Sequence, residues 1–89
     1  MVYSVFMIRH YTLENKPSFN DGDEIDVDMS VMGAKSLGVM KGKVVGKASD
    51  HIIDMWIIDF GMSLNEDKNF SMYPFKVLNV IHTAIVDNK

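Results

Sequence analysis

Histidine is the side chain of this sequence best suited to acid–base or metal chemistry, and the 89 residues include three of them. A zinc site needs three or four ligands that converge from defined spacings, but His10, His51 and His82 fall on separate segments. There is no cysteine, which excludes thiolate ligands and disulfides. No serine–histidine–aspartate arrangement can be assigned either. We therefore expect no catalytic, metal or cofactor site, and we predict that the protein is not an enzyme.

Two short motifs match phosphate or magnesium sites in their letters only. The run GKVVGKAS at 42–49 is too short for the phosphate loop G-x-x-x-x-G-K-[ST], and Ala48 stands where that loop needs a hydroxyl. The triplet DFG at 59–61 matches a kinase magnesium motif, but the other kinase motifs are missing and the chain is far too short. We interpret DFG as a strand end that turns at a glycine.

Charge is distributed unevenly along the chain. Five acids lie within residues 21–28, whereas residues 33–47 carry four lysines and no acid. Lysine provides point charges without bidentate readout of bases, so this basic edge favours a polyanion or an acidic protein surface over a specific DNA sequence. The alternative is that neighbouring strands pair these charges across the sheet. The predicted basic edge consists of Lys35, Lys41, Lys43 and Lys47.

Composition places the chain among small globular domains. It is 47% hydrophobic and 24% charged, and its length predicts a single domain, 1–89. A net charge of −3 argues against a protein dominated by contacts with the DNA backbone. No apolar run approaches the roughly 18 residues of a membrane span, and Arg9 interrupts the apolar N-terminus. We therefore expect no membrane partner, and the lack of cysteine fits a cytoplasmic location.

Period-two alternation of apolar and polar residues runs through most of the chain and predicts strands. Short strands about ten residues apart, separated by polar or glycine-bearing turns and without an amphipathic helix, are typical of small antiparallel barrels. The sequence therefore predicts an all-β fold. It should be a small antiparallel barrel of about five strands over 22–86, with an added N-terminal strand over 2–13.

The alternation also predicts which side chains fill the barrel. One face of the segment 23–31 is expected to be buried, and it carries Ile25, Val27, Met29 and Val31. In the strand 52–60 the expected interior residues are Ile52, Trp56, Ile58 and Phe60. Between these strands, 39–47 should place its lysines on one face and its glycines on the other, and a turn is expected at 47–51. Glycine within a strand often marks bending or a close approach of the backbone.

The strand 52–60 is apolar on both faces, so its outer face needs a cover. An uncovered apolar patch usually marks a surface that binds a partner. Either the N-terminal strand covers it or another chain does, and on this basis we expect a homo-oligomer. The expected oligomer or docking face consists of Val5, Met7, Ile53, Met55 and Ile57.

The pattern GDEIDV…GAKSLGVMKGKVVGKAS…MWIIDF…MYPFKVLNVI, within residues 22–81, resembles the SH3-like barrels. Within them it looks like the KOW-type modules of transcription and ribosome factors. The shared features are a Gly-Asp before the first strand, a G-x-V-V-G strand, an aromatic strand and a Tyr-Pro turn. The likeness concerns turns and strands, so it bears on fold more than on function. It implies nucleic-acid or polymerase contacts on the loop between Ala34 and Gly42.

The layout is also similar to that of the plasmid-borne type II dihydrofolate reductases, which are SH3-like barrels with a pore made by four subunits. Residues 70–73, Phe-Ser-Met-Tyr, match the family's Val-Gln-Ile-Tyr pore segment. Ser71 replaces the glutamine that contacts cofactor and substrate in that family, and Lys35 is no secure equivalent of its pore lysine. The resemblance implies an oligomeric ligand-binding barrel, without reductase activity.

These features favour a small non-enzymatic module that docks on a protein or nucleoprotein partner. The first alternative is a KOW-like module that binds nucleic acid non-specifically through the basic edge, and the second is the oligomeric ligand-binding barrel. Small size and a composition rich in lysine, asparagine, aspartate, isoleucine and methionine suit a phage or mobile-element accessory protein. Such a protein would inhibit or redirect a host machine in the host cytoplasm.

Overall fold

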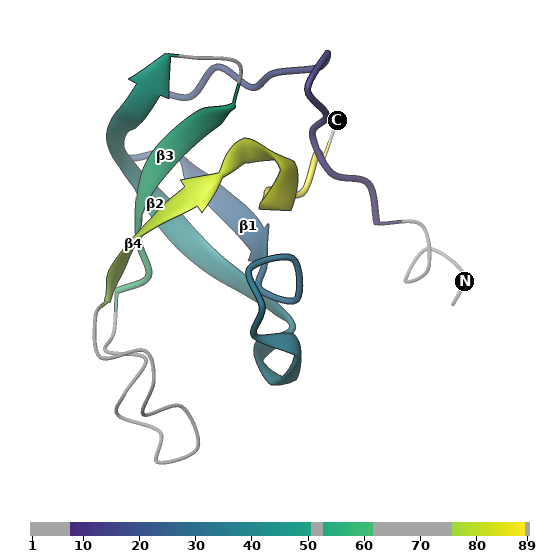
Figure 1. The fold of residues 1–89 in the computed structure, drawn as a ribbon. Helices are drawn as coiled ribbons and strands as arrows, with labels where there is room; N and C mark the ends of the chain where they lie inside the picture. The colour runs from purple at the N-terminus through teal and green to yellow at the C-terminus, as the bar shows by residue number, and fades with distance from the viewer. Residues whose placement is uncertain (1–7, 51–52, 62–75, 89) are drawn as a thin grey trace.

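The computed structural model describes residues 8–50, 53–61 and 76–88, which fold around one antiparallel four-stranded sheet (Figure 1). In sheet order the strands are β1 (Glu24–Asp28), β2 (Val39–Asp50), β3 (Asp54–Asp59) and β4 (Val77–Ile81). Two 3₁₀-helices, η2 (Lys35–Leu37) and η4 (His82–Ala84), are the helical elements of the described residues. The all-β prediction is confirmed. Within the same residues, no helix has the length and apolarity needed to cross a membrane.

The long strand β2 belongs to both halves of the sheet. Its residues 39–43 pair with β1, and its residues 43–50 pair with β3. The register against β3 shifts at Val45 and again at Ala48, where β2 contains an extra residue. Such bulges bend a strand and increase its twist. The turn predicted at 47–51 is therefore wrong in its first residues, because the bulged strand continues through Asp50.

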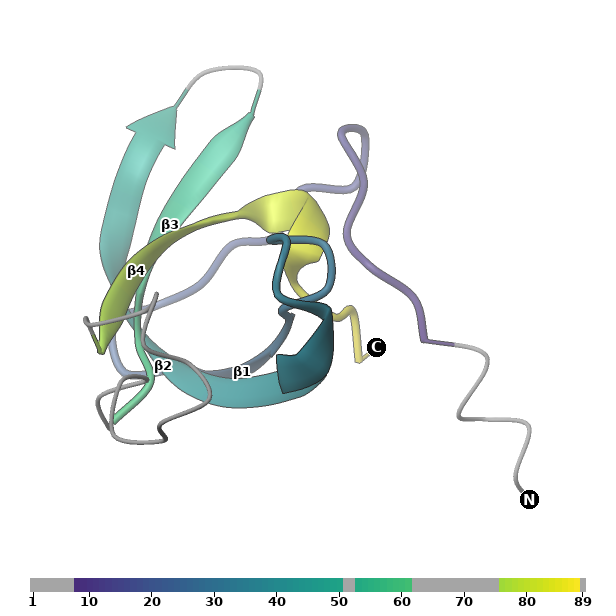
Figure 2. The ribbon, with the colours of Figure 1, turned by 60° about the horizontal axis from the view of Figure 1, so that its bottom comes forward.

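The curved sheet returns to its first strand after η4 (Figure 2). Ile85 forms a β-bridge with Val27, and the N–H of Val86 donates to the carbonyl oxygen of Asp26 at 2.9 Å. These contacts join the C-terminal segment to the free side of β1. The arrangement is compatible with a small β-barrel, with four regular strands and this short bridged segment.

The predicted interior is largely confirmed. The side chains of Trp56, Ile58 and Phe60 are buried, at 4%, 0% and 7% exposure. On β1 and just after it, the buried residues are Ile25, Val27 and Met29. Val31 was expected with them but is 49% exposed. The alternation fails there because β1 ends at Asp28, whose carbonyl oxygen accepts the N–H of Val31 in a turn.

The described part of the predicted N-terminal strand, residues 8–13, is not a regular strand. Only His10 forms a β-bridge, and its partner is Val86. The chain then turns, with the N–H of Asn15 donating to the hydroxyl of Thr12 at 2.9 Å. This segment runs on across one end of the curved sheet before it enters β1 (Figure 1).

Candidate functional site

The four lysines of the predicted basic edge do not form one row. Lys41 and Lys43 are exposed on β2, and Lys35 is exposed in η2. The extra residue at Val45 reverses the alternation, so Lys47 lies opposite the buried Trp56 in register. Directly opposed residues of an antiparallel pair project from the same face. Lys47 therefore lies on the Trp56 side of the sheet, where its Nζ is 5.5 Å from the ring centroid.

Acidic side chains lie beside Lys41 and Lys43, the two lysines of the predicted basic edge that share the outer face of β2. Lys41 Nζ lies 3.4 Å from Asp26 Oδ1. Lys43 is in register with Glu24 of β1 on one side and with Asp59 of β3 on the other. This is the pairing across the sheet that the sequence left open as an alternative. An exposed pair of this kind adds little stability, but it reduces the positive field that a polyanion would meet.

An open pocket of about 400 Å³ lies at this part of the sheet. Its charged lining consists of Glu24, Lys41, Lys43 and Asp59, and the ring of Phe60 also borders it. A phosphate in this pocket would face two carboxylates as well as two ammonium groups. The pocket is therefore mixed in charge, which suits the charged rim of a protein contact better than a dedicated phosphate site.

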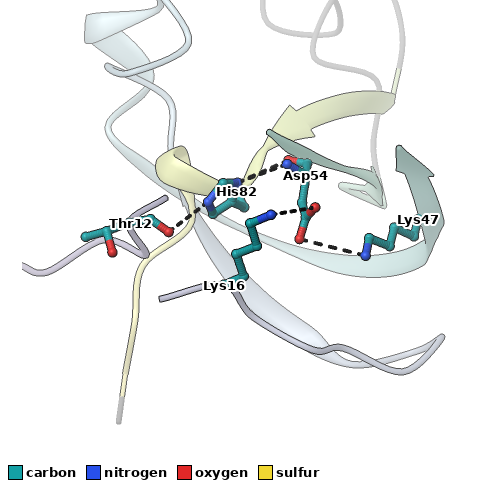
Figure 3. Close-up of polar contacts among 5 residues, drawn as sticks. All are labelled: Thr12, Lys16, Lys47, Asp54 and His82. Carbon is teal, nitrogen blue, oxygen red and sulfur yellow. Dashed lines mark hydrogen bonds and ion pairs between the residues drawn. The ribbon is translucent and has the colours of Figure 1, made fainter. Parts of the chain in front are cut away.

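A buried histidine ties the N-terminal segment to the barrel (Figure 3). His82 of η4 is fully buried, and its Nε2 lies 2.8 Å from the carbonyl oxygen of Thr12. Its Nδ1 accepts the backbone N–H of Asp54 at 3.2 Å. These contacts assign the hydrogen to Nε2 and leave both ring nitrogens engaged with the backbone. His82 thus has a structural role.

The carboxylate of Asp54 completes the group of polar residues around His82. We call this group the barrel-end cluster: Thr12, Lys16, Lys47, Asp54 and His82. The Asp54 side chain is 4% exposed, and its two oxygens lie 3.9 Å from Lys16 Nζ and 3.8 Å from Lys47 Nζ (Figure 3). A buried carboxylate needs nearby positive charge, because burial without it is costly. Within the described residues, no three histidine, aspartate or glutamate side chains gather as a metal site would require. The cluster fastens the N-terminal segment and offers no reactive group of its own.

Aromatic contacts place the same segment against Trp56. The Phe19 ring packs edge-on to Trp56 with centroids 5.0 Å apart, and Tyr11 packs edge-on to Phe19 at 5.8 Å. Trp56 belongs to the inner face of β3. The aromatic contacts of the described N-terminal residues therefore lie on the inner side of the sheet and not on the outer face of β3.

The outer face of β3 carries the predicted docking residues that the structure describes. Ile53 is 43% exposed, while Met55 and Ile57 are half-buried. In register, Ile57 is flanked by Gly46 of β2, which has no side chain to shield it, and by Asn79 of β4. Two exposed valines extend the apolar surface from the neighbouring strands. We call this set the β3 outer face: Val45, Ile53, Met55, Ile57 and Val77.

Some predicted residues lie outside the part of the chain that the structure describes. They are Val5 and Met7 of the docking face, Ile52 of the predicted interior, His51, and the reductase-like segment 70–73. Two features were not predicted from the sequence. Val45 is the unpaired residue at the bulge and Val77 is in register with Asp59, and neither of them was assigned to the face from the sequence. Asp54 and His82 are 28 residues apart, and no local pattern links them.

The fold and these surfaces define a class: a small curved antiparallel β domain with a closed inner core and an exposed apolar outer face. Comparisons with known proteins add no family to it, since no family model, curated protein or solved structure matches this chain.

Proposed function

We propose that this chain is a non-enzymatic binding module that docks on a partner protein through the β3 outer face. The observation that carries the proposal is a set of exposed and half-buried apolar side chains on three neighbouring strands and just before β3, which includes Ile53 and Ile57. Protein interfaces place apolar residues in a central patch and charged residues at the rim. Lys43 and Asp59, paired in register beside this patch, provide such a rim.

The fold that we propose within this class is an SH3-like barrel, as the turn and strand pattern suggested. Four antiparallel strands in sequence order and the return of Ile85 to β1 support it. A small module without reactive groups would act by occupying a surface of a larger assembly. This is how a phage or mobile-element accessory protein would inhibit or redirect a host machine, and we keep that role as part of the proposal.

The test is a comparison of matched variants in affinity capture from the native host. Ile57→Lys places a charge in the proposed contact, whereas Val31→Lys places one on an exposed valine outside the sheet. We expect the wild type and Val31→Lys to retain the same partner and Ile57→Lys to lose it. Thermal unfolding of all three proteins should show that each is folded.

A third variant separates this proposal from the nucleic-acid alternative. Lys41→Glu with Lys43→Glu reverses the two outer lysines of β2. If the basic edge binds the partner, this double variant loses it, and wild-type binding weakens steeply as salt rises. If the partner is retained by Ile57→Lys, the β3 outer face is not the docking surface.

A further inference from the structure

The edge of β4 is a second surface that the described chain leaves unpaired. β4 is the last strand of the sheet and pairs only with β3 in the described residues. An edge strand presents a row of free N–H and C=O groups to any strand that approaches. Natural proteins usually protect such an edge with charged residues, proline or a bulge. Residues 77–81, Val-Leu-Asn-Val-Ile, contain neither a charge nor a proline, and their register against β3 is unbroken.

The pairing with β3 determines which backbone groups of β4 face outward. The N–H of Phe60 donates to the carbonyl oxygen of Lys76 at 2.8 Å, so these two residues form a hydrogen-bonded pair. Hydrogen-bonded pairs recur at every second residue in an antiparallel ladder. Leu78 and Val80 therefore point their backbone groups toward β3. Val77, Asn79 and Ile81 direct theirs to the free edge.

We propose that two copies of this chain pair through these edges, antiparallel, about a two-fold axis that passes between their Asn79 residues. In this register Asn79 lies opposite Asn79 of the second copy, and Val77 lies opposite Ile81. Val77, Asn79 and Ile81 are the residues whose backbone groups face outward. In this register each of them lies opposite another such residue of the second copy, so backbone hydrogen bonds can form along the whole strand. A two-fold interface requires such self-complementarity, because the same patch serves both copies.

The side chains also fit a second copy. Val77 and Asn79 belong to the outer face, since they are in register with Asp59 and Ile57. Pairing would place apolar Val77 beside Ile81 on that face and bring together two asparagines whose amides can bond to each other. No like charges become opposed, because β4 carries none. The β3 outer faces of the two copies would then form one continuous surface that extends across the two paired β4 strands.

This inference goes beyond the proposed function, because it assigns the edge of β4 to a second copy and leaves the β3 outer face to another protein. It also differs from the oligomer that the sequence predicts through Val5, Met7, Met55 and Ile57. If the protein does not dimerise, the proposed edge pairing is wrong, but the docking test with Ile57→Lys keeps its meaning.

The register makes a charge-exchange experiment possible. Asn79→Lys and Asn79→Asp each place like charges opposite each other across the two-fold axis, which disfavours pairing. We expect the wild type to have the mass of two 10.1 kDa chains by light scattering at micromolar concentration. Each variant alone should have half that mass. An equimolar mixture of the two variants should recover the full mass as a heterodimer that native mass spectrometry resolves.

Ser36→Lys, at an exposed position in η2, is the control for added charge and should remain dimeric. Thermal unfolding should show that every variant is folded. Four results would each overturn the proposal. They are a wild type of 10.1 kDa, variants that keep the wild-type mass, a mixture that does not reassociate, and edge amides protected from exchange only when a different protein is added.

Discussion

Replacement of Gly42 by alanine tests the packing between β2 and β3 directly. A Cβ at this position would lie 2.5 Å from Cγ2 of Ile58, 3.2 Å from Phe60 and 3.3 Å from the carbonyl oxygen of Asp59. Ile58 is fully buried, and its branched side chain has few rotamers, so its methyl group has nowhere to move. The backbone oxygen of Asp59 is held in the β2–β3 pairing. The overlap must therefore be relieved by moving the strands apart.

The expected loss follows from two opposing effects. Inserting a methyl group into a packed core costs about 1–3 kcal/mol, while Gly→Ala recovers about 0.4–1 kcal/mol by restricting the unfolded chain. We expect the free energy of unfolding to fall by about 1–2 kcal/mol net, which corresponds to a decrease in Tm of roughly 5–15 °C for a domain of this size. Urea and thermal unfolding followed by circular dichroism would measure both quantities.

Gly46→Ala is the matched control in the same strand. No atom lies within 4 Å of a Cβ built at Gly46, and its backbone is not left-handed. We expect Gly46→Ala to leave the unfolding midpoint unchanged or to raise it slightly. A Gly42→Ala protein as stable as Gly46→Ala would refute the close approach of β2 and Ile58.

Two further predictions concern buried and charged side chains. Trp56→Ala should lower the free energy of unfolding by about 3–5 kcal/mol, because Trp56 is 96% buried (4% exposed); an unchanged urea midpoint would contradict this burial. Asp28→Asn should destabilise the fold at neutral pH, and its deficit should shrink as the pH falls below 3.8. The reason is that hydrogen bonds from Ser30, and then from His10, hold the pKa of Asp28 below its ordinary value of 3.8. A deficit that is constant in pH-dependent unfolding measurements would contradict it.

Alternation identified the core wherever the strands are regular. Ile25 and Val27 of β1 and Trp56 and Ile58 of β3 point inward as the period of two predicts, because each strand keeps its pleat over these residues. The same rule failed for Lys47, because the extra residue at Val45 moves Gly46 and Lys47 to the opposite faces before the second extra residue at Ala48 restores the alternation. Gly46 beside the bulge was a usable signal, since glycine within a strand often accompanies one.

The barrel-end cluster could not have been predicted in the same way. His82 contacts Asp54 across 28 residues and Thr12 across 70. No period or motif spans such separations, because these contacts depend on how the curved sheet brings its ends together. The composition of the N-terminal segment showed that it is apolar enough to pack, but not which face of β3 it would reach.

The described N-terminal residues pack against the inner side of the sheet, and this position bears on the role of the β3 outer face. Phe19 packs on Trp56 from the inner side and Tyr11 packs on Phe19, while the carbonyl oxygen of Thr12 and the ammonium group of Lys16 are held there by His82 and Asp54. The described part of this segment is therefore fastened by aromatic, polar and charged contacts on the inner side of the sheet. The inner core is thus completed by residues of the described chain, and Ile53 and Ile57 belong to the surface that we propose as the docking site.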